Sequence, residues 1–142
     1  MNKIKQLVIT FVVAFLVVIG IGGTAQAART DMLDVSDYNN NGQALTTQQY
    51  INLRNNYGIK TITVKISEGQ TWNASTARAN ISDASQAGLY TNGYHFARYN
   101  SVVTAQAEAR HAVQQAQVDG LGIGSVIVTD AESSAQSGVS KA

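Results

Sequence analysis

The sequence predicts an α/β fold built on a parallel sheet of four strands with three intervening helices. Two observations support this class. Short apolar, β-branched runs alternate with stretches of helical periodicity, and glycine or polar turns keep the connections between them short. Strand–helix alternation of this kind favours βαβ units around a parallel sheet. With 142 residues, 44% of them hydrophobic, the chain has the length of one domain and is too apolar to be disordered.

The first predicted unit runs from residue 32 to residue 67. A short apolar strand at 32–35, followed by Ser36, ends at the turn-forming sequence Asn-Asn-Asn-Gly at 39–42. A helix then begins with Thr46 or Thr47 as its N-cap and ends at Gly58 in the C-cap position. The second strand is predicted at 59–67, because apolar and polar residues alternate there.

The same rhythm continues to residue 129. A helix is predicted at 73–86 with a stop at Gly88, and a third strand lies within 89–99, centred on Gly-Tyr-His-Phe at 93–96. Residues 102–118 are rich in alanine with apolar spacings of three and four, which is typical of an amphipathic helix. The fourth strand is predicted at 125–129 and leads directly into Asp130-Ala131-Glu132.

The N-terminus has the three parts of a secretory signal peptide. Lys3 and Lys5 precede an apolar run at 7–21, and the small-x-small sequence Ala25-Gln26-Ala27 follows. We expect cleavage after Ala27, a secreted or wall-associated product of residues 28–142, and membrane contact only through the signal segment. The run is shorter than the ~20 residues that span a bilayer comfortably. An uncleaved anchor that tethers an interaction domain is the alternative.

Composition excludes several classes of function. The chain has no cysteine, so it can form neither disulfides nor thiolate metal sites, and its two histidines do not suggest a zinc site. Ten basic and nine acidic residues give a formal charge of +1 without a basic stripe, so we expect no nucleic-acid partner. The glycine-rich segment 120–124 precedes a strand rather than opening a helix, so it is not a phosphate loop. No cofactor or metal is expected.

Scarce ionisable side chains gather where the predicted strands end. Asp34 and Asp37 follow the first strand, Glu68 the second, His95 lies at the end of the third, and Asp130 and Glu132 end the fourth. The carboxyl ends of parallel strands share one rim, where α/β folds bind ligands. These side chains are therefore expected to converge on one site.

Asp130 and Glu132 form the most informative pair. Residues two apart on a strand share a face, with Cα atoms about 6.6 Å apart. One of two carboxyls held so close should keep its proton at higher pH, as a general acid beside an ionised partner requires. The alternative is a solvated strand end. His95 can equally be a packed, hydrogen-bonded residue, and Lys65 can be either an inward charge paired with an acid or an exposed lysine.

Four short motifs in order resemble the family 25 glycoside hydrolases, the N-acetylmuramidase lysozymes of bacteria and their phages. They are Leu-Asp-Val-Ser at 33–36, Val-Lys-Ile-Ser-Glu-Gly at 64–69, Gly-Tyr-His-Phe at 93–96 and Val-Thr-Asp-Ala-Glu at 128–132. The resemblance covers residues 32–132. It implies an irregular β/α, TIM-like barrel, of which residues 28–142 form the N-terminal part. The strands from the fifth onward, with a further acid, are expected to be missing.

The resemblance also implies an activity: cleavage of the β-1,4 bond between N-acetylmuramic acid and N-acetylglucosamine in peptidoglycan glycan strands, by a monomer. Glu132 would be the proton donor, Asp130 would orient and polarise the 2-acetamido group or stabilise the positive ring, and Asp34 would line the pocket. Substrate-binding residues would be Tyr94, His95, Glu68 and Lys65. Retention of configuration is favoured, although the spacing alone does not exclude inversion. The alternative is a truncated, non-catalytic fragment that binds the cell wall or is vestigial.

Overall fold

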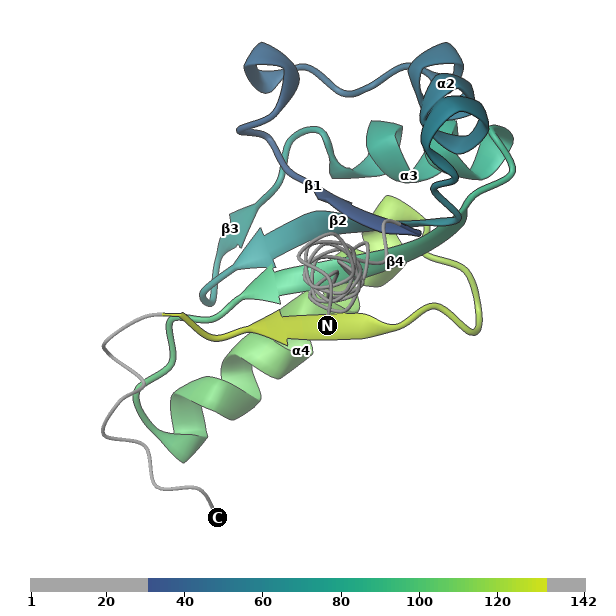
Figure 1. Cartoon of the computed structure of the whole chain (residues 1–142). Helices are drawn as coiled ribbons and strands as arrows, with labels where there is room; N and C mark the ends of the chain where they lie inside the picture. The colour runs from purple at the N-terminus through teal and green to yellow at the C-terminus, as the bar shows by residue number, and fades with distance from the viewer. Residues whose placement is uncertain (1–30, 133–142) are drawn as a thin grey trace, which may run out of the picture.

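A computed structural model describes residues 31–132 of the chain. Four of the five strands of the sheet are parallel, β1 (Met32–Val35), β2 (Thr61–Glu68), β4 (Tyr90–Phe96) and β5 (Ile127–Asp130), in the spatial order β1-β2-β4-β5. Figure 1 shows the arrowheads of β2, β4 and β5 pointing the same way. The helices α2 (Thr47–Tyr57), α3 (Ala77–Gln86) and α4 (Val102–Asp119) connect consecutive parallel strands. This arrangement confirms the predicted fold class.

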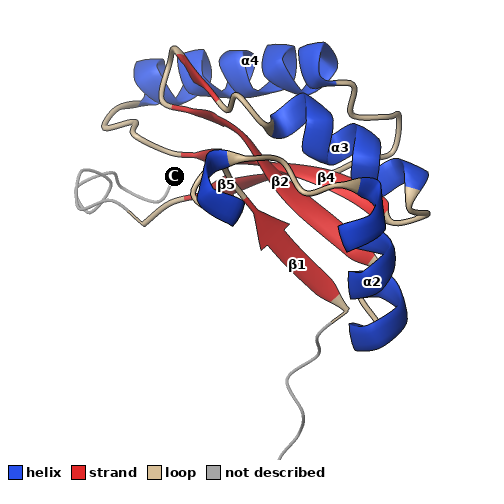
Figure 2. Cartoon of the chain, turned by 90° about the horizontal axis from the view of Figure 1, so that it is seen from above, coloured by secondary structure: helices blue, strands red, loops and turns tan. Residues whose placement is uncertain are grey.

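All three helices lie on the same side of the sheet. In Figure 2, α3 and α4 run along one side of the strands and α2 lies beside α3. On this closed face, side chains from β2 pack with side chains from the helices and the turns that follow them. The fully buried members of this core include Ile62, Val64, Ile66 and Tyr50. The strand alternation places the residues between them, Thr63 and Lys65, on the opposite, open face.

Local sequence signals fix the ends of two helices. Thr46 caps α2 in a capping box with Gln49, and Gly58 ends the helix in the left-handed conformation that glycine adopts readily. Ser101 and Thr104 form the same box at the start of α4, which ends at Gly120 with φ of 84°. The predicted cap at Thr46 and the stop at Gly58 are therefore confirmed.

The structure corrects several boundaries. The helix predicted at 73–86 begins only at Ala77, after a turn at Ser75 and Thr76 whose backbone N–H groups donate hydrogen bonds to the Asp37 carboxylate. A two-residue strand that the sequence did not predict, β3 (Trp72–Asn73), pairs antiparallel with the end of β2. A short 3-10 helix, η1 (Asn40–Gly42), occupies the predicted turn, with positive φ at all three residues.

The predicted signal segment, residues 1–27, and the chain after Glu132 lie outside the described residues. Within residues 31–132, no helix combines the length and the apolar character that crossing a membrane requires.

Candidate active site

Three of the predicted carboxylates line one pocket on the open face of the sheet. The pocket has a volume of about 390 Å³, and its carboxylates are Asp34 from β1, Asp130 from β5, and Glu132 just beyond β5. The remaining lining residues are Met32, Thr63, Tyr94, Val128, Thr129 and Ala131. Of the six side chains expected to converge, the structure brings these three into one pocket, and Asp37, Glu68 and His95 are not among its lining residues.

Register and curvature explain how distant segments meet there. Asp34 lies opposite Thr63 in the β1–β2 ladder, and Tyr94 lies opposite Val128 in the β4–β5 ladder. Strands β1 and β5 are separated by β2 and β4, yet both contribute carboxylates to the same pocket. The open face must therefore be concave, as strand twist and coiling of a parallel β/α sheet produce.

Tyr94 lies among these carboxylates. Burial raises the pKa of its phenol, a hydrogen bond with the Ser36 side chain opposes this, and the nearby charges of Asp34, Asp130 and Glu132 raise it further. The three carboxylates that line the pocket thus also lie near enough to the Tyr94 hydroxyl to influence it electrostatically. The neutral phenol of Tyr94 can act as a hydrogen-bond donor in this pocket.

Lys65 and Glu68 lie on the open face beside this pocket but are not among its lining residues. Lys65 is 4% exposed, and its Nζ lies 2.6 Å from Glu68 Oε2. Arg98 holds the other oxygen of Glu68, with Nη2–Oε1 and Nε–Oε1 distances of 2.6 and 2.9 Å. Lys65 was predicted to be either an inward-facing charge paired with an acid or an exposed lysine, and the structure supports the first interpretation.

The Lys65 ammonium is also surrounded by aromatic rings. It lies 4.8 Å from the ring centroid of Trp72, 5.0 Å from that of Phe96 and 5.3 Å from that of Tyr38. Burial alone would raise the pKa of Glu68, but hydrogen bonds and charges from Lys65 and Arg98 outweigh it and hold that pKa below its ordinary value. This cluster fixes the carboxyl end of β2 and keeps a positive charge close to the acidic pocket.

His95 lies on the closed face, because adjacent residues of a strand point to opposite sides and Tyr94 faces the pocket. Its ring is 3% exposed, with Nδ1 2.8 Å from Ser67 Oγ and Nε2 3.1 Å from Glu108 Oε2 on α4. The structure therefore does not bring His95 to the carboxylates. The Ser67–His95–Glu108 chain is not a nucleophilic triad either, since Ser67 is fully buried and no substrate can reach it.

Five lining residues of the pocket were not among the predicted site residues: Met32, Thr63, Val128, Thr129 and Ala131. Thr63 could have been found, because it precedes Lys65 by two residues and must share its face. Met32 and Val128 give no comparable signal, since apolar residues on a short strand are expected to face the core.

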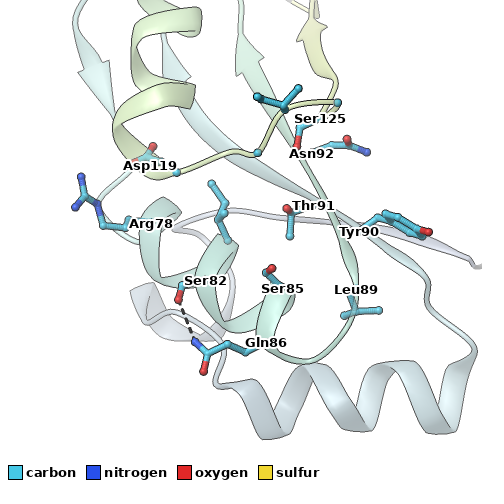
Figure 3. A pocket seen from close by; sticks show the side chains of 15 residues that line it. Arg78, Ser82, Ser85, Gln86, Leu89, Tyr90, Thr91, Asn92, Asp119 and Ser125 are labelled. Atoms are coloured by element: carbon cyan, nitrogen blue, oxygen red, sulfur yellow. Dashed lines mark hydrogen bonds between the residues drawn. The ribbon is translucent and has the colours of Figure 1, made fainter.

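A larger pocket, about 790 Å³, lies at the opposite end of the strands (Figure 3). It is formed by α3, the start of β4 and the segment that follows α4. Its one carboxylate, Asp119, is 6% exposed and accepts a hydrogen bond from Gln115. Because this pocket has no paired acids, the smaller pocket is the better candidate for chemistry. Within residues 31–132, no group of three or more His, Asp or Glu side chains could hold a metal ion.

Comparison with known proteins shows which family the chain resembles. A family model described as glycosyl hydrolases family 25 matches residues 33–142. The modular autolysin LytC from Streptococcus pneumoniae is similar in structure, with a TM-score of 0.58 and 14% identity over 70% of this chain and 22% of that chain. The CTP1L endolysin has a TM-score of 0.52 and 23% identity over 70% of this chain and 34% of that chain.

A bacterial lysozyme from Streptomyces coelicolor is 26% identical over 58% of this chain and 34% of that chain, with a TM-score of 0.48. The chain thus covers between 22% and 34% of the length of these solved structures. The autolysin and the endolysin share its fold. No curated protein matches the chain in sequence.

Proposed function

Because this chain belongs to glycosyl hydrolase family 25, a family of peptidoglycan-cleaving muramidases, we propose that its acidic pocket is the substrate site of a muramidase. The bond cleaved would be the β-1,4 bond between N-acetylmuramic acid and N-acetylglucosamine. The single observation that supports this best is the shared pocket of Asp34, Asp130, Glu132 and Tyr94. The substrate would then be a glycan strand of peptidoglycan. The protein would reach it outside the cell, after export directed by the predicted signal peptide.

The chemistry assigns different tasks to the carboxylates. Glycosidic cleavage passes through an oxocarbenium-like state, which needs one protonated acid at the leaving oxygen and negative charge near the ring. Glu132 is exposed, so its carboxyl can reach a bound chain and donate the proton. Asp130, half-buried at the end of β5, would polarise the 2-acetamido group or stabilise the positive ring, and Asp34 would face it from β1. Assistance by the acetamido group would give retention of configuration.

Tyr94 would complete the site as a neutral donor. Its phenol can donate a hydrogen bond to a carboxylate or to the sugar without adding charge. Lys65 and Glu68 would contribute to substrate binding indirectly, because their ion pair sets the shape and the charge of the surface beside the acidic pocket. His95 is not included in the proposed site, because Ser67 and Glu108 occupy both of its ring nitrogens.

The proposal is tested by incubating the full chain with purified peptidoglycan and measuring the release of reducing ends. We expect release by the wild type and its loss, by at least about 100-fold, in Glu132→Gln, since general acid catalysis contributes about 10²–10⁴-fold. Asp119→Asn, at the opposite end of the strands, is the matched control and should keep its activity. Thermal unfolding of each variant separates lost chemistry from lost folding. Undiminished release by Glu132→Gln would remove its role as the acid.

The open face favours one alternative, binding to the cell wall without cleavage. In the described part of the chain, the pocket has only the wall that the four parallel strands supply, and Met32 and Val128 in it are 62% and 46% exposed. Co-sedimentation with purified walls, without release of reducing ends from the wild type, would support this alternative over hydrolysis.

A further inference from the structure

Thr63 differs from every other buried polar residue in the described part of the chain. It lies in the middle of β2, opposite Asp34 on β1 and Asn92 on β4, and it is 6% exposed. Its Oγ1 atom has no hydrogen-bond partner, and among the described residues it is the one buried side-chain polar atom in that condition. An unpaired buried hydroxyl destabilises the folded state, because it has lost its water without gaining a partner.

Other buried hydroxyl groups in the described part of the chain have hydrogen-bond partners. On the closed face, the Tyr50 hydroxyl donates to Asn80 Oδ1 at 2.8 Å, and Ser67 pairs with His95. A valine at position 63 would have the same branched shape and a strong preference for strands, without the polar atom. The packing of β2 therefore does not explain the hydroxyl of Thr63.

The position of Thr63 suggests what the hydroxyl meets. Thr63 lines the pocket together with the three carboxylates, while the exposed side chains of Met32 and Val128 add apolar surface to it. A ligand group that suits this wall has a methyl for the apolar side chains and a carbonyl or N–H for the hydroxyl. The acetamido group of an N-acetylated sugar carries all three.

We propose that Thr63 is a ligand-positioning residue whose hydroxyl hydrogen-bonds the acetamido group of a saccharide bound in the acidic pocket. The proposal rests on the function proposed above. In the empty pocket Oγ1 is covered, but a rotation of about 120° about χ1, from one staggered rotamer to the next, would move the hydroxyl to the position that the methyl group occupies. Binding would thus give the hydroxyl the partner that folding alone does not supply.

Two measurements on the full chain test this, with Thr63→Val as the main variant. Thermal unfolding without ligand should show a midpoint a few degrees above that of the wild type, since the unpaired hydroxyl is gone. Titration calorimetry with tri-N-acetylchitotriose should show about 5- to 10-fold weaker binding, the worth of one neutral hydrogen bond. A residue with a purely structural hydrogen bond would instead lose stability when the hydroxyl is removed.

Two control variants sharpen the result. Thr63→Ser keeps the hydroxyl and should bind within about threefold of the wild type, although loss of the methyl lowers its melting temperature. Thr61→Val makes the same change on the same strand, outside the pocket, and should bind the trisaccharide as the wild type does.

The outcomes separate the two proposals. If the wild type binds the trisaccharide and Thr63→Val binds it equally well, or melts at a lower temperature, the role of Thr63 is overturned while the sugar site stands. If the wild type does not bind the trisaccharide at all, the sugar site itself fails, and the role of Thr63 fails with it.

Discussion

The closed and open faces of the sheet differ in almost every physical respect, although the same strands build both. On the closed face of β2, Ile62, Val64 and Ile66 are fully buried beneath the helices. On the open face, the same strand presents Thr63, which lacks a hydrogen-bond partner, and Lys65, which is paired with Glu68. Because successive side chains of β2 point to opposite faces, the residues that stabilise the fold and the residues available for chemistry lie on different sides of the sheet. One face supplies the free energy of folding, and the other can carry groups that cost stability.

The largest effect that tests this difference comes from one substitution made on both faces. Val64→Ala removes two fully buried methyl groups and leaves a cavity, so we expect a loss of about 2–3 kcal/mol in the free energy of unfolding. Val128→Ala makes the same change on the open face, where the side chain is 46% exposed, and should cost no more than about 0.5 kcal/mol. Urea denaturation measures both. Equal losses would mean that the open face is also a packed core.

A smaller effect is expected from adding an atom to the closed face. A Cβ at Gly93 on β4 would lie 2.8 Å from Leu121 Cδ1 and 3.1 Å from Ile66 Cδ1, closer than packed carbons approach. Gly93→Ala should therefore lose about 1 kcal/mol of stability, because Leu121 is only half-buried and can shift.

The matched control for Gly93→Ala is Gly122→Ala. Nothing lies within 4 Å of the Cβ that this change adds, so urea denaturation should show little change. If Gly93→Ala proved neutral as well, the packing between β4 and the segment after α4 would be looser than the structure indicates.

The two faces were also unequal in how far the sequence could predict them. Apolar periodicity gave the strands and helices of the closed face, since burial acts on every second or every third and fourth residue. The capping residue Thr46 and the stop at Gly58 are local signals and were predictable. The entry to α3 was not, because Asp37 caps it from 38 residues away in the chain.

The open face depends on contacts between segments far apart in sequence. Strand-end placement was enough to predict that Asp34, Asp130 and Glu132 converge, but not that Tyr38, Trp72 and Phe96 surround the ammonium of Lys65. Nor could a pattern of residue types show that Thr63 has no hydrogen-bond partner, since that depends on every neighbour at once. The sequence left His95 undecided between a packed, hydrogen-bonded residue and a residue of the sugar site, and its hydrogen bonds to Ser67 and Glu108 correspond to the first.

The smallest effect concerns the pH dependence of stability, which should arise at Glu68 on the open face. Its pKa is lower in the folded protein than in the unfolded chain, because Lys65 and Arg98 together outweigh the effect of burial. In the window between the two pKa values the unfolded chain binds more protons, so stability rises with pH there. The stabilisation is complete above the unfolded pKa of 4.5 and is lost as the pH falls through the folded value.

Urea denaturation at a series of pH values below 5 should therefore show a slope in the wild type that is shallower in Glu68→Gln. The mutant will be less stable at neutral pH, since Lys65 loses its partner in a buried position, so the slopes rather than the absolute stabilities are compared. Val64→Ala is the matched control from the closed face: it should lower stability by a constant amount and leave the slope unchanged. An equal slope in Glu68→Gln and the wild type would assign the acid sensitivity to other carboxyls. The contrast between the faces would then hold for packing but not for charge.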